Sequence, residues 1–463
     1  MPLDHDTIAA IATPVGQGGI GIVRISGPAA LAMAGKIFSP RDPGVRFESH
    51  RLYLGHLIDP HSGNPVDEVL LSCMRAPHSY TCEDIVEINS HSGYRLLSKI
   101  LEILLDQGAR LARPGEFTLR AFLNNRIDLT QAEAVVDLIN AKSETGLLVA
   151  SRQISGAFKR QIEGLRQRTI DILAHAEVAI DFPEEESDRF SRQRGAEAIL
   201  QDLITPVQEL MAAHAERIWV DGIRTVIAGR VNAGKSSLLN RLSNEDRAIV
   251  TPVPGTTRDI IESDINVGGI PLKLMDTAGL RDVSDEVEKA GIQLTRQKMS
   301  EADLILLILD RSRPLDHDDF QIIQQARDKN AVVVINKIDL PPGLSAQDTS
   351  RISAAFPNAC VVELSALTGE GIDVLKKKVA ETIMGEGSDQ SPSEAVPNLR
   401  HRRALGDALL AFQAAKQNTE QDAPMEIVAL ELKTGLDALG EITGETSTEQ
   451  VLEAVFSQFC LGK

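Results

Sequence analysis

Apolar residues in the first 120 positions recur at two different spacings. Alternating or short apolar runs predict five β-strands, at 7–12, 20–25, 51–58, 66–74 and 84–89. Apolar residues at three- and four-residue steps predict one helix over 93–107, which Gly108 should end. Arg24 and Glu87 are charged residues at strand positions; such residues usually belong to solvated strand edges, and the alternative is that they line a site. The first segment should therefore have an α+β fold.

Helical spacing then dominates on both sides of a central segment. One continuous stripe of apolar residues runs from Ile154 to Ala176 and should end before Pro183, because proline breaks a helix. Further helices are predicted at 194–217, 399–417 and 425–442, with a last one beginning near 447.

Two helix starts carry a capping-box pattern, in which a serine or threonine precedes a glutamate or glutamine by three residues. The pairs are Thr130 with Glu133, and Ser447 with Gln450. Each should mark the first turn of a helix.

Strand and helix patterns alternate between the two helical stretches. The composition of 385–392 is that of a linker. We therefore expect a domain of 1–120, a helical domain split into 121–217 and 385–463, and an α/β domain of 218–384 inserted into it. The two helical parts should pack together, because neither can bury its apolar stripe alone.

The inserted segment opens with a phosphate-binding motif. Residues 229–236 fit G-x-x-x-x-G-K-[ST], between an apolar run at 225–228 and a helical stretch after it. In this setting backbone N–H groups close around a phosphate chain, Lys235 reaches the outer phosphates, and the Ser236 hydroxyl can bind Mg²⁺.

Three more signals follow in order, each after an apolar run: Asp276-Thr277-Ala278-Gly279, Asn336-Lys337-Ile338-Asp339 and Ser365-Ala366. The Asp339 carboxylate can accept from both guanine N1–H and its exocyclic amino group, a donor pair that adenine lacks. GTP is therefore predicted, not ATP.

Hydrolysis requires groups that sense the γ-phosphate and orient water. The hydroxyls of Thr256 and Thr257 in 255–259 can reach Mg²⁺ and the γ-phosphate. Leu280 stands where many small GTPases carry a water-orienting glutamine, so another group must act. The nearby acidic candidates are Asp282, Asp285, Glu286 and Glu288.

The sequence shows no evident arginine finger that could supply positive charge to the transition state. A monovalent cation held by Asn232 and by carbonyls of 251–256 could supply it, although Asn232 could equally cap its loop.

Composition narrows the function classes. A hydrophobic content of 43% and a charged content of 25% are ordinary for a globular protein. Aromatic residues make up 3%, which argues against stacking platforms for bases, and a net charge of −18 argues against broad wrapping of nucleic acid. The four cysteines show no metal-binding spacing. We expect a cytoplasmic protein without a membrane segment.

Longer stretches carry a family resemblance: 12–27, 79–84, 113–124, 276–281 and the terminal Phe459-Cys460-Leu461-Gly462-Lys463. With these and the inserted GTPase motifs, the chain resembles the tRNA uridine-5-carboxymethylaminomethyl modification GTPase family, MnmE or TrmE, along nearly its whole length. Three departures are Val231 for the usual proline, Cys82 for glycine and Leu461 for isoleucine.

The resemblance implies a multidomain α+β and α/β protein with an N-terminal folate-binding domain that dimerises, a long-helix domain and an inserted Ras-like GTPase domain. A 5-formyltetrahydrofolate-type cofactor would be contacted by Arg24 and Glu87. Arg126 falls where the family has a lysine, which keeps the charge but not the geometry. Cys460 would act in the modification chemistry, and Lys463 ends the same cofactor-binding tail.

The resemblance also assigns the nucleotide and ion sites. Glu288 would orient water; K⁺ would bind Asn232, Thr251, Val253 and Thr256; and Mg²⁺ would bind Ser236 and Thr257. The remaining nucleotide contacts would be Ala233, Gly234, Lys235, Ser237, Pro252, Pro254, Gly255, Asp276, Thr277, Ala278, Gly279, Asn336, Lys337, Asp339, Ser365, Ala366 and Leu367.

The expected function is a K⁺-stimulated GTPase that modifies wobble uridines of certain tRNAs. It would be a homodimer and would form a heterotetramer with an FAD-dependent partner. One alternative is a GTP-dependent ribosome-assembly switch without modification chemistry, and another is a free-standing folate methyltransferase with a vestigial GTPase domain. The folate-type segment and Cys460 disfavour the switch, which needs neither.

Overall fold

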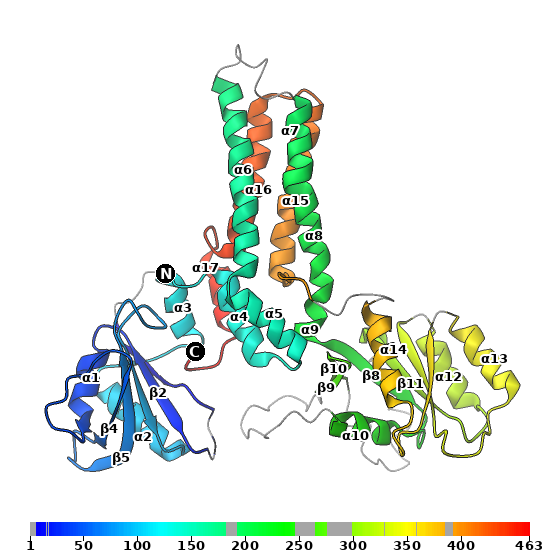
Figure 1. The fold of residues 1–463 in the computed structure, drawn as a ribbon, viewed down its shortest axis with the longest axis horizontal. Helices are drawn as coiled ribbons and strands as arrows, with labels where there is room; N and C mark the ends of the chain where they lie inside the picture. Colours follow the sequence, from blue (N-terminus) through cyan, green and yellow to red (C-terminus); the bar gives the residue numbers. More distant parts are fainter. Residues whose placement is uncertain are drawn as a thin grey trace.

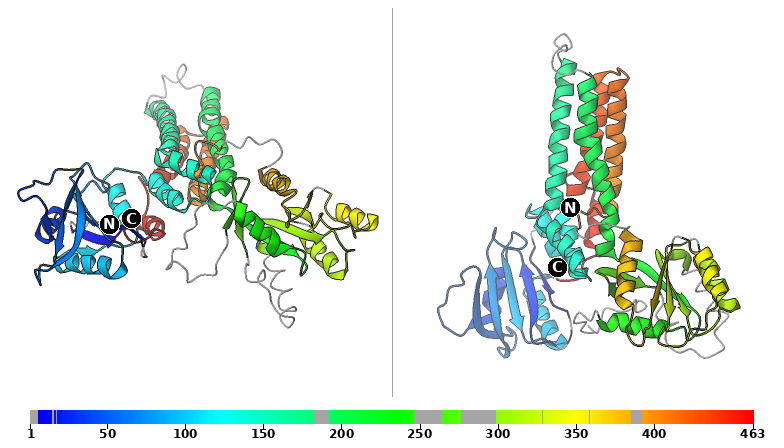
Figure 2. Two further views of the ribbon diagram at one scale, coloured as in Figure 1. Left: turned by 60° about the horizontal axis from the view of Figure 1, so that its bottom comes forward. Right: turned by 45° about the vertical axis from the view of Figure 1, so that its right-hand side comes forward.

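A computed structural model of the 463-residue chain describes residues 6–14, 16, 18–181, 192–245, 264–275, 299–327, 329–357, 359–384 and 392–463. A tall bundle of helices stands between two domains built on sheets (Figure 1). The views of Figure 2 agree that the two sheet domains lie on opposite sides of the foot of the bundle.

The N-terminal domain is a seven-stranded sheet with the order β3-β4-β5-β6-β2-β1-β7. Its strands are β1 Ile8–Ile11, β2 Gly21–Ser26, β3 Phe38–Pro40, β4 Arg51–Ile58, β5 Pro65–Met74, β6 Ile85–Ser90 and β7 Arg110–Leu111. Helices α1 (Ala30–Ile37) and α2 (Tyr94–Asp106) pack their apolar sides on one face of this sheet. The five predicted strands and the helix over 93–107 are confirmed, whereas β3, β7 and α1 were not predicted.

Arg24 and Glu87 do not lie at a strand edge, so that expectation was wrong. They are directly paired residues of β2 and β6, and both strands have a neighbour on each side. Their side chains lie on the sheet face opposite the apolar core, because Val23 and Ile25 point into that core.

The helical part is built from both ends of the chain. Its helices are α3 Glu116–Leu123, α4 Leu129–Asn140, α5 Glu144–Ile154, α6 Ala157–Asp181, α7 Arg192–Ala198, the π-helix η2 Ile199–Ile204, α8 Thr205–Ala213, the 3₁₀-helix η3 His214–Arg217, α9 Ile218–Asp221, α15 Leu399–Glu420, α16 Met425–Thr443 and α17 Glu449–Phe456. Side chains of α6, η2, α8, α15 and α16 share one core. The two helical flanks therefore pack together as their apolar stripes predict.

Three local expectations for these helices were wrong. The stripe that starts at Ile154 is not one helix: α5 ends there, and Gly156, with φ +81°, separates it from α6. The cap of α4 is Asp128, which accepts from the Gln131 N–H, and not Thr130. Helix α17 begins after Thr448, which makes no side-chain capping bond, so the Ser447 box is absent.

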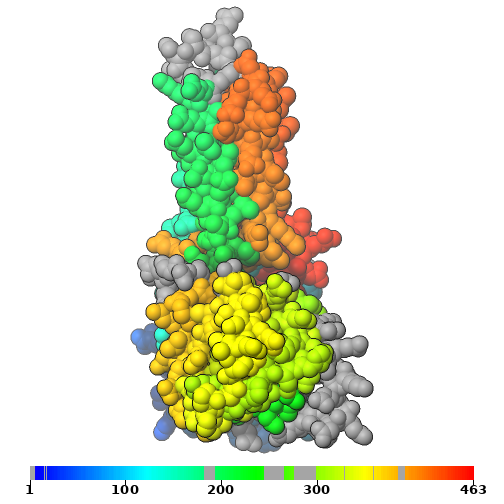
Figure 3. Space-filling model, turned by 90° about the vertical axis from the view of Figure 1, so that its right-hand side faces the viewer, coloured from blue at the N-terminus to red at the C-terminus, as the bar shows by residue number. Residues whose placement is uncertain are grey.

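The inserted domain is a six-stranded sheet with the order β13-β12-β11-β8-β10-β9, parallel except for β9. Its elements are β8 Ile223–Gly229, α10 Lys235–Glu245, β9 Asp264–Val267, β10 Ile270–Leu274, β11 Leu304–Asp310, α12 His317–Ala326, β12 Ala331–Asn336, α13 Ala346–Ala355, β13 Cys360–Leu364 and α14 Ile372–Met384. Turned to face the viewer, this domain lies below the bundle (Figure 3).

Candidate functional sites

The phosphate-binding motif lies where the sequence places it, between β8 and α10. Two of its glycines are obligatory. Gly229 has φ +154°, and a Cβ there would lie 2.4 Å from the Ile308 carbonyl oxygen. Gly234 has φ +99°, and its Cβ would lie 2.0 Å from Asn336 Nδ2. The loop can therefore close around phosphate only with glycine at both positions.

Lys235 is held against its own loop. Its Nζ donates to the carbonyl oxygens of Gly229 at 2.8 Å and Arg230 at 2.7 Å. Burial lowers the pKa of this ammonium group. A phosphate that entered the loop would offer this half-buried cation a charged acceptor, which makes a stronger hydrogen bond than a carbonyl does.

Asn336 joins the phosphate loop to the segment that follows β13. Its side chain is buried; Nδ2 donates to the Ala233 carbonyl at 2.8 Å, and Oδ1 accepts from the Ala366 N–H at 2.9 Å. One amide thus fixes the spacing between the phosphate end and the base end of a nucleotide site.

The remaining base-site residues are also held in place. The Ser365 hydroxyl donates to Asp339 Oδ1 at 2.6 Å, so this carboxylate keeps its orientation. Lys337, with φ +68°, extends back to Asp310 Oδ2 at 2.6 Å. Leu367, which is 75% exposed, accepts a hydrogen bond from Arg241 through its carbonyl.

The structure thus brings together the predicted residues of 232–237, 336–339 and 365–367. Asn232 has the left-handed conformation, with φ +63°, at the tip of the phosphate loop. The other predicted nucleotide, ion and water-orienting residues lie outside the described residues: Thr251, Pro252, Val253, Pro254, Gly255, Thr256, Thr257, Asp276, Thr277, Ala278, Gly279 and Glu288. Among the residues that the structure describes, no group of three or more His, Cys, Asp or Glu side chains could hold a metal ion.

A second site lies on the N-terminal sheet. Arg24 Nε donates to Glu87 Oε1 at 2.8 Å, and the Arg24 guanidinium lies 5.9 Å from the centre of the Tyr80 ring. Arg126 approaches the same ring at 5.0 Å and donates to the Tyr80 carbonyl at 2.7 Å. Tyr80 therefore lies beside two of the three predicted folate contacts, Arg24 and Arg126. The sequence did not single it out, although it lies within the stretch 79–84 that carries the resemblance.

A buried ion network fixes the loop that carries Tyr80. The Arg120 side chain, 3% exposed, donates to both oxygens of Glu83 at 3.1 and 3.2 Å and to Asp6 at 2.6 Å. Glu83 also accepts a hydrogen bond from the Ser26 hydroxyl at 2.7 Å. The same hydroxyl lies 2.7 Å from the Thr81 hydroxyl. Because Arg120, Ser26 and Thr81 are buried and their polar groups are paired, the loop has few alternative positions.

The C-terminal tail docks beside this site. Phe456 and Phe459 pack with α4 in a small core, and the Gly462 carbonyl accepts from Arg24 NH1 at 3.4 Å. Gly462 has φ +89°, and a Cβ there would lie 2.2 Å from the Ile11 carbonyl oxygen. Cys460, two residues earlier, is exposed. Figure 1 shows the C-terminal end of the chain between the N-terminal sheet and the bundle.

The chain matches known proteins over nearly its whole length. Models of the "GTP-binding protein TrmE N-terminus" and the "MnmE helical domain" match residues 7–126 and 129–460. A tRNA modification GTPase MnmE of Carboxydothermus hydrogenoformans is 45% identical over 99% of this chain and 100% of its own length. One of Geobacter metallireducens is 46% identical over 99% of both chains.

The chain belongs to the tRNA modification GTPase MnmE family. It is accordingly a GTP hydrolase that acts in tRNA modification. Among solved structures, Era of Aquifex aeolicus bound to GDP·AlF4⁻ is 28% identical, with a TM-score of 0.27, over 42% of this chain and 67% of its own.

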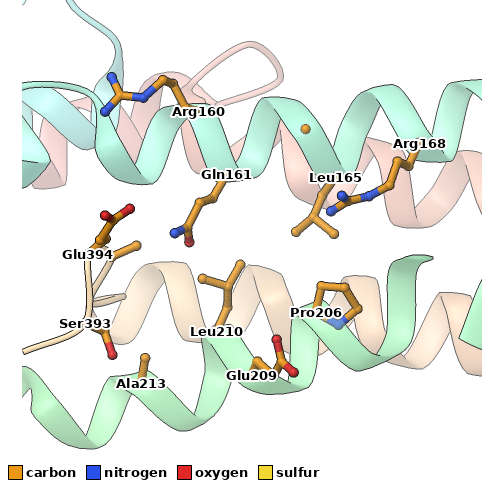
Figure 4. Close-up of a pocket in the computed structure, with 12 residues that line it drawn as sticks. Arg160, Gln161, Leu165, Arg168, Pro206, Glu209, Leu210, Ala213, Ser393 and Glu394 are labelled. Atoms are coloured by element: carbon orange, nitrogen blue, oxygen red, sulfur yellow. The ribbon is translucent and has the colours of Figure 1, made fainter. Parts of the chain in front are cut away.

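A further cleft of about 400 Å³ separates α6 from α8 in the bundle of this MnmE-family chain. Leu165 and Leu210 face one another across it, and Ser393 and Glu394 close one end (Figure 4). It is lined by neither the phosphate-loop residues nor those around Tyr80. In the described part of the chain, no helix is long and apolar enough to cross a membrane.

Proposed function

We propose that this chain is a K⁺-stimulated GTPase whose hydrolysis cycle drives the addition of an aminomethyl or carboxymethylaminomethyl group to C5 of the wobble uridine in certain tRNAs. The carbon would come from a 5-formyltetrahydrofolate-type cofactor, and an FAD-dependent partner would complete the reaction within a heterotetramer. The setting would be the cytoplasm, where tRNA and GTP are found.

The observation that carries this proposal is the contact between Gly462 and Arg24. It brings the tail that contains Cys460 to the sheet site of Arg24, Glu87 and Arg126. A folate carries a flat heterocycle with N–H donors and a tail of carboxylates. Glu87 offers acceptors for such donors, and two guanidinium groups offer partners for carboxylates.

In the nucleotide site, Lys235 would bind the β- and γ-phosphates, and Asp339 the guanine base. Mg²⁺ would be held by the hydroxyls of Ser236 and Thr257 and would neutralise phosphate charge. K⁺ would be held by the side chain of Asn232, which stands in the phosphate loop, together with Thr251, Val253 and Thr256. Glu288 would orient the attacking water.

Dimerisation is proposed through the N-terminal sheet. Leu52 and Leu70 are 63% and 41% exposed on β4 and β5. By strand register they belong to the face that carries Arg24 and Glu87, which α1 and α2 do not cover. A second copy on this face would bury these leucines and enclose the folate site.

The decisive experiment is mass spectrometry of wobble uridines from cells that lack the protein and from cells complemented with Cys460→Ser. Loss of the C5 group in both, with GTP hydrolysis by the purified variant intact, is the expected result. Normal uridines in the deletion strain would favour the alternative, a GTP-dependent ribosome-assembly switch.

A hydrolysis measurement and a binding measurement complete the test. GTP hydrolysis should rise when K⁺ replaces Na⁺; equal rates in both salts would remove the cation role. Folate binding by the full chain should be lost in Arg24→Gln but kept in Arg51→Gln, a matched arginine that pairs with Glu48 at an exposed position.

A further inference from the structure

The chain crosses twice between the helical bundle and the GTPase domain, and both crossings are tied to the bundle. In the outgoing crossing, Arg217 of η3 donates to both carboxylate oxygens of Asp137 on α4, at 2.6 and 2.7 Å. Both side chains are nearly buried. Beyond them, Trp219 of α9 is a core residue of the GTPase domain, and its carbonyl accepts from Ser143 at 3.1 Å.

The returning crossing is bound to the outgoing one. Glu216, next to Arg217, accepts from the Ser393 N–H at 2.5 Å and from the Ser393 hydroxyl at 2.7 Å. His214 Nδ1 lies 2.7 Å from the Pro397 carbonyl oxygen. The described parts of the two crossings are therefore joined by hydrogen bonds.

Helix α4 also binds the start of α15, which follows the returning crossing. Glu133, one turn before Asp137, accepts from Arg400 at 2.7 and 2.8 Å and lies 2.6 Å from His401 Nε2. Arg400 in turn donates to the carbonyls of Glu441 and Ile442 at the end of α16. One side of α4 is thus a polar junction that joins the GTPase crossings to the bundle.

The neighbouring side of α4 holds the tail. Leu129, Ala132 and Val136 recur at helical spacing and form a small core with Phe456 and Phe459. Gly444 ends α16 against α4, because a Cβ there would lie 3.0 Å from Leu129 Cβ. The tail beyond Phe459 reaches Arg24.

The returning crossing has open space beside it. Ser393 and Glu394 form the end wall of the cleft between α6 and α8 (Figure 4). Gly164 faces the same cleft, with no atom within 4 Å of the position a Cβ would take. The crossing is thus held by Glu216 and by α5, whose Arg152 and Gln153 donate to the Pro392 and Val396 carbonyls, and it is open toward the cleft.

From this arrangement we infer that α4 couples the two sites: Asp137, through Arg217, is a positioning residue that transmits the state of the GTPase domain to the tail carrying Cys460. The inference rests on the proposed function and adds to it the physical connection between hydrolysis and modification. Such coupling needs contacts that differ between two states, and the ion pair at the crossing is placed to supply them.

The test compares Asp137→Asn with Asp303→Asn. Asp303 makes the same kind of bidentate pair with Arg224, at 2.8 and 2.9 Å, on the surface of the GTPase domain and away from α4. Docking of the tail is measured as the rate at which a carboxypeptidase removes Lys463, with GDP and then with a non-hydrolysable GTP analogue. Steady-state GTP hydrolysis and modified uridine are measured in parallel.

In the natural protein and in Asp303→Asn, the two nucleotides should give tail-cleavage rates that differ by at least about fivefold, the lower range of known coupling. In Asp137→Asn the ratio should fall close to one, modified uridine should drop, and GTP hydrolysis should stay within about twofold of the natural rate. Arg217→Gln should give the same results as Asp137→Asn. The variant with both substitutions should lose no more modified uridine than either single variant.

Equal tail-cleavage rates with both nucleotides in the natural protein would overturn the inference while leaving the proposed function standing. A parallel loss of hydrolysis and modification in Asp137→Asn would also overturn it, because that pattern belongs to a purely structural residue. Failure of the proposed function is distinct: the natural protein would then make no modified uridine. If Asp137→Asn does not fold, Ser393→Ala removes the hydroxyl hydrogen bond between the two crossings and should lower the ratio.

Discussion

Replacement of Gly462 by alanine isolates the contribution of tail docking. The residue has φ +89°, a conformation that costs an alanine roughly 1–2 kcal/mol more than a glycine. Since about 1.4 kcal/mol is tenfold in an equilibrium, this strain alone lowers the equilibrium constant for docking of the tail about 5- to 30-fold. The new Cβ would also lie 2.2 Å from the Ile11 carbonyl oxygen and 2.8 Å from Ala12 Cα, so the tail cannot keep its position.

We expect Gly462→Ala to lose at least about tenfold in uridine modification, measured by mass spectrometry, with GTP hydrolysis unchanged. Carboxypeptidase should remove Lys463 faster than from the natural protein. Gly63→Ala is the matched control, because Gly63 has φ +69° but nothing within 4 Å of its Cβ position. Gly63→Ala has the backbone strain without the clash, so this variant should modify uridine at the natural level. Full modification by Gly462→Ala would show that docking at Arg24 is not required.

Three further outcomes are expected. Asn336→Ala should weaken GTP binding at least about tenfold in a fluorescent-nucleotide titration, because it leaves the buried Ala366 N–H without its acceptor, which costs about 1–3 kcal/mol. Unchanged affinity would contradict the bridging role of Asn336. Gly234→Ala should abolish tight GTP binding without unfolding the chain, since its Cβ would meet Asn336 Nδ2; binding within a few-fold of normal would show that the loop relaxes. Thermal stability should fall as the pH drops from 7 to 4, because His401 and Glu133, a buried pair, both bind fewer protons in the folded chain than in the unfolded chain. Burial lowers the pKa of His401. Burial alone would raise the pKa of Glu133, but His401 and Arg400 hold it well below its ordinary value. His401→Gln should flatten the upper part of this decline, near pH 6.5. A thermal unfolding midpoint that does not change with pH would refute the role of this pair.

Local patterns in the sequence predicted the elements that depend on near neighbours. The five alternating runs of the N-terminal domain and the amphipathic helices are present because each buries an apolar side whose spacing is visible along the chain. The phosphate loop was equally readable, since its glycines, Lys235 and Ser236 lie within eight residues. Helix starts were less certain, as Asp128 shows, because several polar residues near α4 could cap it and packing selects one.

The tertiary structure alone decided which distant residues meet. Arg24 and Gly462 are 438 positions apart, and no periodicity links them; the docking of α17 on α4 does. Tyr80 lies between two arginines only because β2 and the turn after α3 converge on its loop. Asp137 and Arg217 likewise look like ordinary surface charges in a helical sequence. Burial makes them partners, since two charges removed from water are stable only when each satisfies the other.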